Sequence, residues 1–354
     1  MGPKKHRQVG SGGREIVGNG DDWVAETLNP TVSAVGSFPA VTDVTSETGY
    51  PNSGYTLQLN TNMSSSSPAC GGYGYQTCKV WEQFIYSTDY SGGNAQVFIQ
   101  NWLFIPTGTS CPSGWTTYDT SAYNGCYKNS GAEDVPSVSA TQLASLKLSG
   151  YVVTNGYDTA TFTDGTTAYA VSEANSTLDI SYVWNESEFN VVGNGGGSQA
   201  QFNVGASVTV ELRVSDGSTT APACAADAGT TGEINNMILS ASCSAYGGTY
   251  PYIEFSESAS LGTPTFTSET IVSSTFAQEK WQLDWTSVAN ATYYQVWLGG
   301  VDFTPPYYLE VSTSATDGDV TIGRGGFGTY AVQACNASGC GAYSSPVSLS
   351  YPLH

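Results

Sequence analysis

The chain has 354 residues, of which only 11% are charged, and its formal net charge at pH 7 is −20. So negative a protein repels nucleic acid and anionic membrane surfaces, which excludes both as expected partners. The 41 glycines and 23 tyrosines, in a Ser/Thr-rich background without helical runs, predict an all-β protein whose length suits two domains.

A short basic arm precedes the first expected domain. Residues 1–20 are glycine-rich and lack periodicity, which predicts a disordered tag or propeptide remnant. Residues 21–258 hold many short alternating segments separated by Pro, Gly, Asn-Gly and Asp-Gly, a pattern typical of strands joined by tight turns. We therefore expect an antiparallel β-sandwich or jelly roll (concanavalin-like) over residues 21–258, which is the candidate catalytic domain.

The early part of this domain offers one clear strand, and its middle offers one helix. Tyr55–Met63 alternates cleanly, so its Gln58 and Asn60 share a face that points outward or into a groove. Residues 136–150, PSVSATQLASLKLSG, are the segment that predicts a short helix. No stretch of the chain is long and apolar enough to span a membrane.

Two further strands carry polar side chains among large aromatic ones. The segment CKVWEQFIYS places the neighbours Glu82 and Gln83 on opposite faces of its strand. The segment AQVFIQNWLFIP places Gln100 and Trp102 on a common face. An amide in such company needs partners if it is buried, and it can serve a substrate if it lines a groove.

The segment YVWNESEFNVVGNGGGSQAQFN, residues 182–203, predicts a strand that runs into a glycine loop. Its alternation puts Glu186 and Glu188 on the face of Trp184. One interpretation is a catalytic carboxylate held at the lip of a cleft. The other is a solvated strand face beside a flexible turn.

The cysteines fall into close pairs along the sequence, with no histidine near them. An even number in local pairs predicts a disulfide framework and an oxidising compartment. Because short closures are favoured, we expect the sequential pairing, which is Cys70–Cys78, Cys111–Cys126, Cys224–Cys243 and Cys335–Cys340.

Histidine is almost absent. The chain has only His6 and His354, one in each terminal segment, so a Ser-His-Asp or Cys-His arrangement is not available within the fold. A histidine-ligated zinc is excluded for the same reason. Any acid–base chemistry must therefore fall to carboxylates, assisted by amides, hydroxyls and the backbone.

The last part of the chain has a different character. Residues 259–274 are rich in Ser, Thr and Pro and predict a linker. Residues 275–354 resemble a fibronectin type III domain, through Trp285, Tyr293, Tyr294, the run YAVQA at 330–334, Asn336, Gly339, Tyr343 and Ser344. The resemblance implies a smaller β-sandwich that acts as a spacer or binding unit, so we place no chemistry there.

Four segments of the larger domain together resemble the glutamic peptidases (eqolisins). They are VGSFPAV at 35–41, VWEQFIYS at 80–87, FIQNWLF at 98–104, and WNESEFNV at 184–191 followed by QFNVGASVTV. Their order is similar to that of the family. The resemblance implies a secreted acid endopeptidase whose catalytic pair is a glutamine and a glutamate on neighbouring strands.

Carried over to this chain, the resemblance implies Gln83 and Glu188 as the catalytic pair. Glu188 would take a proton from the attacking water, and Gln83 would donate an amide N–H to the oxyanion. Glu186 is the alternate glutamate, since it stands two residues after Trp184 and Glu188 stands four. The substrate cleft would include Trp81, Gln100, Trp102 and Trp184.

Two other functions stay open. The first is a jelly-roll glycoside hydrolase in which Glu82 and Glu188 form the carboxylate pair and aromatic residues stack on sugar rings. Because Glu82 and Gln83 point to opposite faces, this function and the peptidase function need opposite faces of the same strand. The second is a non-enzymatic secreted protein that binds carbohydrate or acts as an adhesin.

The expected setting follows from these observations. We expect a secreted, monomeric protein that needs no cofactor and no metal ion. Its partner would be a protein or peptide substrate, or alternatively a polysaccharide.

Overall fold

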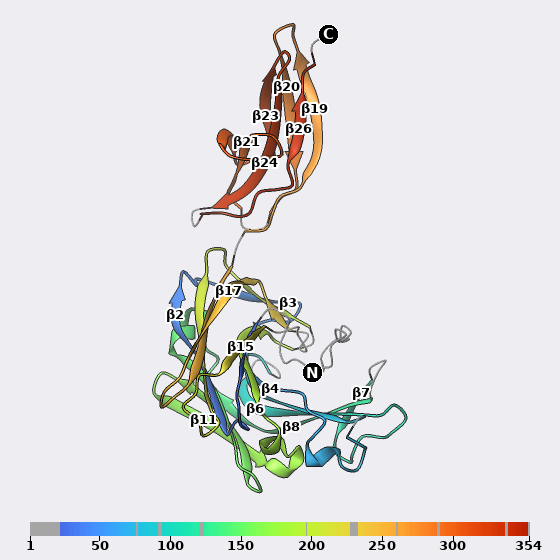
Figure 1. Ribbon diagram of the computed structural model, residues 1–354, viewed down its shortest axis with the longest axis vertical. Coiled ribbons are helices and arrows are strands. Elements are labelled where there is room, and N and C mark those ends of the chain that lie inside the picture. Colours follow the sequence, from blue (N-terminus) through green and yellow to red (C-terminus); the bar gives the residue numbers. More distant parts are fainter. Residues whose placement is uncertain are drawn as a thin grey trace. The chain divides into compact units, whose positions relative to one another are not determined.

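The computed structural model describes residues 22–75, 77–90, 94–119, 124–195, 197–226, 233–259, 261–288, 291–336 and 339–352. The arm at residues 1–20 lies outside the described residues, so the expectation for it stays a prediction. The chain divides into two compact units, residues 1–258 and 259–354 (Figure 1). Both consist of β-sheets in which all pairs but one small parallel one are antiparallel, which confirms the predicted all-β class.

The first unit contains two large sheets. In the first sheet the strands follow the order β15 (Ala223–Ala226), β1 (Trp23–Glu26), β12 (Glu186–Gly193), β4 (Tyr55–Thr61), β5 (Lys79–Ser87), β6 (Ala95–Ile105), β8 (Asn124–Val135) and β7 (Thr116–Asp119). In the second sheet the order is β11 (Thr167–Ala174), β10 (Tyr157–Asp164), β9 (Leu146–Val152), β2 (Ser33–Thr42), β14 (Ser207–Ser215), β18 (Tyr252–Ala259) and β17 (Met237–Tyr246).

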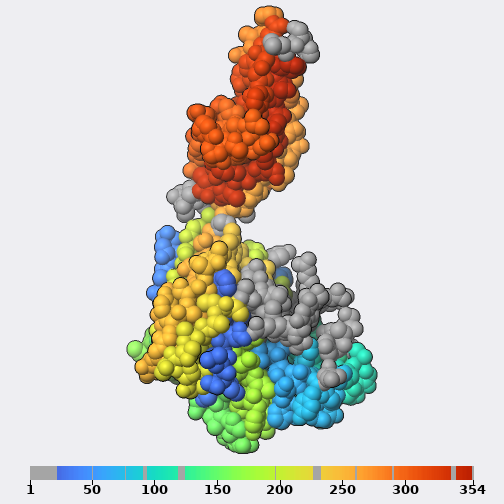
Figure 2. All heavy atoms as spheres, viewed as in Figure 1, coloured from blue at the N-terminus to red at the C-terminus, as the bar shows by residue number. Residues whose placement is uncertain are grey.

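These two sheets pack face to face as a sandwich, with β4, β5, β6 and β12 of one against β2, β9, β10 and β14 of the other. A small third sheet joins β16 (Ile234–Asn235), β13 (Gln199–Phe202) and β3 (Glu47–Tyr50). Segments from the two ends of the unit lie side by side, since β1 pairs with β15, and blue and yellow atoms adjoin in Figure 2.

Most of the layer between the sheets is apolar and closely packed. Phe38 of β2 meets Phe189 of β12 with ring centroids 5.2 Å apart, and both side chains are buried. Phe189 also fills the space over Gly36, where a Cβ atom would stand 2.0 Å from the ring. Phe84 of β5 covers Gly150 of β9 in the same way. These contacts fix the odd-numbered side of β12 against the second sheet, and they leave Glu186 and Glu188 on its other face.

Short 3₁₀ turns link the strands: η1 (Pro68–Cys70), η2 (Ala140–Ser145), η3 (Asn175–Thr177) and η4 (Ile180–Tyr182). The helix expected over residues 136–150 is wrong except for η2. The Leu-Lys-Leu alternation after it forms β9, in which Leu146 and Leu148 face the core and Lys147 is exposed. Period-two burial in the sandwich outweighs the local helical pattern.

The second unit is a smaller pair of sheets. One holds β19 (Phe266–Ser274), β20 (Gln278–Trp285) and β23 (Asp317–Gly323). The other holds β22 (Tyr308–Thr313), β21 (Tyr293–Gly299), β24 (Phe327–Asn336), β25 (Gly339–Cys340) and β26 (Val347–Ser350). Buried Trp285 and Tyr294 join the two sheets with ring centroids 5.7 Å apart. The linker expected over residues 259–274 needs correction, because β19 pairs with β20.

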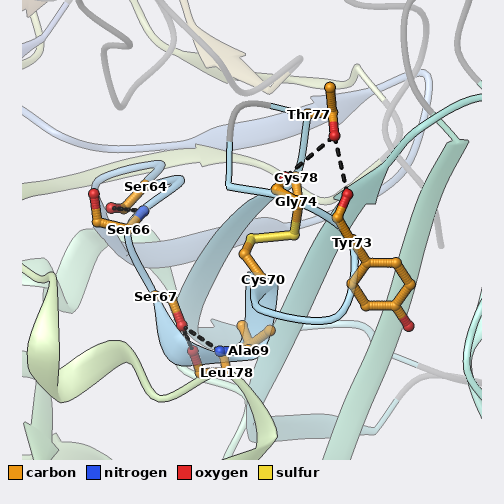
Figure 3. The surroundings of a disulfide bond; sticks show 10 residues. All are labelled: Ser64, Ser66, Ser67, Ala69, Cys70, Tyr73, Gly74, Thr77, Cys78 and Leu178. Atoms are coloured by element: carbon orange, nitrogen blue, oxygen red, sulfur yellow. Dashed lines mark hydrogen bonds between the residues drawn. A yellow bond between two sulfur atoms is a disulfide. The ribbon is translucent and has the colours of Figure 1, made fainter.

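The sequential cysteine pairing is confirmed. The described residues contain the disulfides Cys70–Cys78, Cys111–Cys126, Cys224–Cys243 and Cys335–Cys340, and no cysteine there is free. The first of them closes the turn between η1 and β5, where Ser67 Oγ accepts from the Ala69 N–H and donates to the Leu178 carbonyl (Figure 3). This many disulfides indicates an oxidising compartment.

No helix among the described residues has the length and apolar content needed to cross a membrane.

Candidate functional site

A row of polar side chains crosses the first sheet at one level. Glu188 of β12 stands opposite Asn60 of β4, and Asn60 stands opposite Gln83 of β5. Gln83 in turn stands opposite Gln100 of β6. Residues directly opposite one another on paired strands project from the same face, so these four side chains lie on one side of the sheet.

Hydrogen bonds join three of these side chains, Gln83, Asn60 and Glu188, to one another and to Trp102 of β6, and this hydrogen-bonded series is called the row below. The indole Nε1–H of Trp102 donates to Gln83 Oε1 at 3.0 Å, and Gln83 Nε2 donates to Asn60 Oδ1 at 3.0 Å. Asn60 Nδ2 donates to Glu188 Oε2 at 2.9 Å. The predicted pair, Gln83 and Glu188, is therefore brought together through one bridging asparagine.

Gln83 also borders a small pocket that is partly open to solvent. Amide, hydroxyl, aromatic and aliphatic side chains form its walls. The lining residues are Thr56, Gln58, Trp81, Gln83, Ile85, Ser87, Tyr90, Phe98, Gln100, Asn194, Gly195 and Glu233. A mostly uncharged concave surface with a few converging polar groups suits an organic ligand or a peptide.

Of the four residues expected in the cleft, two line this cavity and a third packs against them. Trp81 and Gln100 are among its lining residues. Trp102 is buried beside them, with its ring centroid 6.4 Å from that of Trp81 and its Nε1–H donating to Gln100 Oε1 at 3.0 Å. The rings of Trp81, Trp102 and Phe104 form one buried cluster, which makes this wall rigid.

The expectation that Trp184 lines the cleft is wrong. Trp184 lies between η4 and β12, because the strand begins only at Glu186. Its ring centroid is 5.7 Å from that of Phe84, which points away from Gln83 on β5, and its indole N–H donates to the Glu186 carbonyl. The alternation of the sequence does not extend back through the turn, so Trp184 belongs to the inter-sheet core.

Glu188 lies at a group of buried acids. Asn190, the next residue on the same face of β12, donates through Nδ2 to Asp22 and to Glu257. Burial, together with the charges of Glu257 and Glu188, raises the pKa of Asp22 well above its usual range. Burial and nearby negative charge both favour the protonated form of a carboxyl group, so Asp22 holds its proton to higher pH than a free aspartate does.

The alternate glutamate, Glu186, shares the face of Glu188 and is also buried. Its backbone N–H donates to Asn62 Oδ1, an acceptor shared with the N–H of Asn185. Glu186 stands opposite Glu26 of β1. Glu186 therefore lies two residues along β12 from Glu188, which is the residue level with Asn60 and Gln83.

The carboxylate pair expected for a glycoside hydrolase is wrong. Glu82 is fully buried on the opposite side of β5 from Gln83, where it interacts with Asp158 of β10 and Glu173 of β11. Burial, then the charges of those two acids, raises the pKa of Glu82 well above its usual range. Glu82 and Glu188 lie on opposite sides of one sheet, so they cannot flank a common sugar.

Two residues of the site were not singled out from the sequence. For Asn60, the sequence indicated only that its side chain shares a strand face with Gln58, through the alternation of residues 55–63. For Glu233, the sequence offered no indication, because no periodic segment precedes it. It is nevertheless the carboxylate that borders the cavity together with Gln83.

The described residues contain no group of three or more His, Cys, Asp or Glu side chains arranged to hold a metal ion.

Comparisons with known proteins give distant similarities only. No family model and no curated protein matches the chain. Among solved structures, SCP-B, a member of the eqolisin family of peptidases in a complex with the tripeptide Ala-Ile-His, is 12% identical, with a TM-score of 0.31 over 69% of this chain and 98% of its own. Scytalido-glutamic peptidase with a transition-state analog inhibitor is 13% identical, with a TM-score of 0.28 over 68% and 96%.

The chain is also similar to a structure described as FN3tt mut, at 25% identity and a TM-score of 0.19, over 24% of this chain and 90% of that one. Because all these TM-scores are low, the function has to be argued from the site itself.

Proposed function

We propose that this protein is a secreted acid endopeptidase of the glutamic type, in which Gln83 and Glu188 hydrolyse peptide bonds. The observation that carries the proposal is the row Gln83–Asn60–Glu188, hydrogen-bonded at 3.0 and 2.9 Å, whose Gln83 end borders a partly open cavity. The secreted location rests on the four disulfides.

In the proposed reaction, ionised Glu188 takes a proton from a water molecule as that water attacks the scissile carbonyl carbon. The carbonyl oxygen becomes an oxyanion and accepts an N–H of Gln83. Glu188 then gives its proton to the leaving nitrogen as the C–N bond breaks. The balance is one water consumed, with an acid and an amine as products.

The hydrogen bonds of Gln83 indicate where the substrate carbonyl binds. Both N–H groups of Nε2 are engaged, one with Asn60 and one with Gln58 Oε1 at 3.1 Å. Gln58 lines the cavity, whereas Asn60 connects to Glu188. The substrate oxygen therefore replaces Gln58 Oε1 as an acceptor, and the bond to Asn60 stays in place.

Acid conditions suit this site. Asp22, whose pKa burial and the neighbouring charges raise, is neutral in mild acid, so it leaves one negative charge fewer beside Glu188. As pH rises, Asp22 ionises, and its negative charge repels that of Glu188. Activity is expected to be highest in acid and to fall toward neutral pH.

The test is hydrolysis of a denatured protein substrate across acid to neutral pH, with folding checked by circular dichroism. Gln83→Ala is expected to lower kcat by roughly 100- to 1000-fold, as loss of an oxyanion donor does elsewhere. Glu188→Gln is expected to abolish hydrolysis, because the general base is gone.

Two matched variants identify the base. Glu233→Gln changes the other carboxylate near Gln83, and Glu186→Gln changes the alternate on β12; both should keep most of the activity. Loss of activity in either, with Glu188→Gln still active, would contradict the assignment of Glu188. No hydrolysis by the unmutated chain at any pH would overturn the peptidase proposal, and a polysaccharide-binding screen would follow.

A further inference from the structure

Trp102 stands at one end of the polar row and Glu188 at the other. The two ends differ in whether they donate or accept hydrogen bonds. An indole N–H donates and never accepts, whereas an ionised carboxylate accepts and never donates. The two amides between them, Gln83 and Asn60, each have one accepting end and one donating end. The row therefore has a direction.

That direction follows from Trp102 alone. The indole N–H is shared between Gln83 Oε1 and Gln100 Oε1, each at 3.0 Å, and because it only donates, the atom of each amide that faces it is an oxygen, which turns Nε2 of Gln83 toward Asn60. The atom of Asn60 facing Nε2 must then be Oδ1, which turns Nδ2 toward Glu188. Trp102 is fully buried and its ring is packed between Trp81 and Phe104, so the indole cannot rotate away.

We infer that Trp102 and Asn60 are positioning residues that select the working state of the catalytic pair: the row is complete only when the Glu188 oxygen facing Asn60 carries no proton. A proton on that oxygen would face the Nδ2 hydrogens of Asn60. To remove this contact between two donors, the amide of Asn60 would have to flip, and the amide of Gln83 would then have to flip as well. The flipped Gln83 would point its NH₂ group at the indole N–H, which is again a contact between two donors. The row thus links protonation of Glu188 Oε2, the oxygen that faces Asn60, to the orientation of Gln83.

The catalytic consequence of this inference rests on the proposed function, but the linkage itself does not. Other ionisable groups that face Glu188 are Asp22 ahead of β1, Glu257 of β18 and, on the same strand, Glu186. Near Trp102, the ionisable neighbours are Tyr118 and Tyr127, and Glu233 interacts with Tyr118. Asp22 directly precedes β1, which pairs with β12 on the side opposite β4, so it does not take the place of Asn60 in the row.

The direct test is ¹⁵N NMR of the full chain, with the Trp102 indole signal assigned through Trp102→Phe. In the unmutated protein, that signal is expected to move with pH, and the movement should disappear in Glu188→Gln. Asn60→Ala is expected to abolish it as well, since the link is cut. The indole of Trp184 is the internal control, because it donates to the Glu186 backbone carbonyl and lies outside the row.

A Trp102 signal that follows pH in Asn60→Ala as it does in the unmutated chain would overturn the inference. So would a Trp102 signal that ignores pH while Glu188 titrates. If Asn60→Ala does not fold, Trp102→Phe retains the ring packing, and the side-chain amide signals of Asn60 then report whether its orientation has been released.

Kinetics separate the inference from the proposed function. Asn60→Asp puts a carboxylate in place of the donor to Glu188, so the acid limb of the kcat profile should move up by about one pH unit. KM should change little, because Asn60 does not line the cavity. An active enzyme whose profile is unchanged in Asn60→Asp would sink the inference alone; an inactive unmutated chain would sink the proposed function, and the NMR result would still decide the row.

Discussion

Glu82 and Gln83 are neighbours in β5, yet their side chains belong to different environments. Gln83 borders the cavity and hydrogen-bonds to Asn60, whereas Glu82 is enclosed between the sheets next to Asp158. One residue step along a strand reverses the face, so a single segment supplies both a site residue and a buried acid. The two can be changed independently.

Glu82→Gln is expected to stabilise the protein at neutral pH and leave hydrolysis unchanged. Burial raises the pKa of Asp158 from 3.8 to about 7, and it also raises that of Glu82. Between pH 3.8 and about 7, Asp158 holds a proton in the folded state that it releases in the unfolded state. The contribution of this proton to stability is therefore fully present below about pH 3.8 and is lost as pH rises to about 7.

The glutamine of that variant does not ionise, and its amide can donate to the Asp158 carboxylate. Thermal unfolding at acid and neutral pH measures the effect. Tm should rise at neutral pH, by about 2–4 °C for each kcal/mol gained, and should change little in acid. A lower Tm at neutral pH, or loss of hydrolysis, would show that the Glu82 carboxylate is needed there.

Gly36→Ala should weaken both the fold and the site. The new Cβ would stand 2.0 Å from the ring of Phe189, which lies between Glu188 and Asn190 on β12. Overpacking of this kind costs about 1–3 kcal/mol, and displacement of Phe189 moves the strand that carries Glu188. The free energy of unfolding measured in urea and kcat should therefore fall together.

Gly131→Ala is the matched control for this change. Gly131 lies in β8 with nothing within 4 Å of an added Cβ, so stability and activity should stay near those of the unmutated chain. Equal effects of the two substitutions would mean that the contact with Phe189 is not the cause.

Removal of the Cys111–Cys126 disulfide should loosen the wall behind Trp102. The bridge spans a sequence separation of 15 in the β7–β8 hairpin, and a loop of that size is stabilised by about 3 kcal/mol. Tyr118 and Tyr127 of this hairpin pack on Trp102 at 5.9 and 5.1 Å. The Cys111→Ser/Cys126→Ser protein should lose stability by about that amount, and kcat should fall.

The Cys335–Cys340 bridge provides the comparison. It has a sequence separation of only five and lies in the second compact unit, whereas the row belongs to the first. Cys335→Ser/Cys340→Ser should leave peptide hydrolysis unchanged. Equal loss of activity in both double variants would mean that the effect does not pass through Trp102.

The sequence by itself determined the secondary-structure class and the local chemistry. Period-two alternation identified the strands that carry Asn60, Gln83 and Glu188, because strand geometry is local and each residue's face follows from its parity. Cysteine spacing gave the disulfides, since short loops close at least entropic cost. The shortage of histidine limited the chemistry to carboxyl groups and amides.

Only the tertiary structure decided which of these strands lie side by side and what covers each face. Asn60, Gln83 and Glu188 come from segments up to 128 residues apart, and their alignment depends on the register of three paired strands. Trp184 satisfied the alternation of its segment but lies before the strand begins, in the core. Odd or even position along a strand determines which side chains share a face. Whether that face meets a cavity or another sheet depends on residues far away in the sequence, because strand pairing and burial are set by the whole fold.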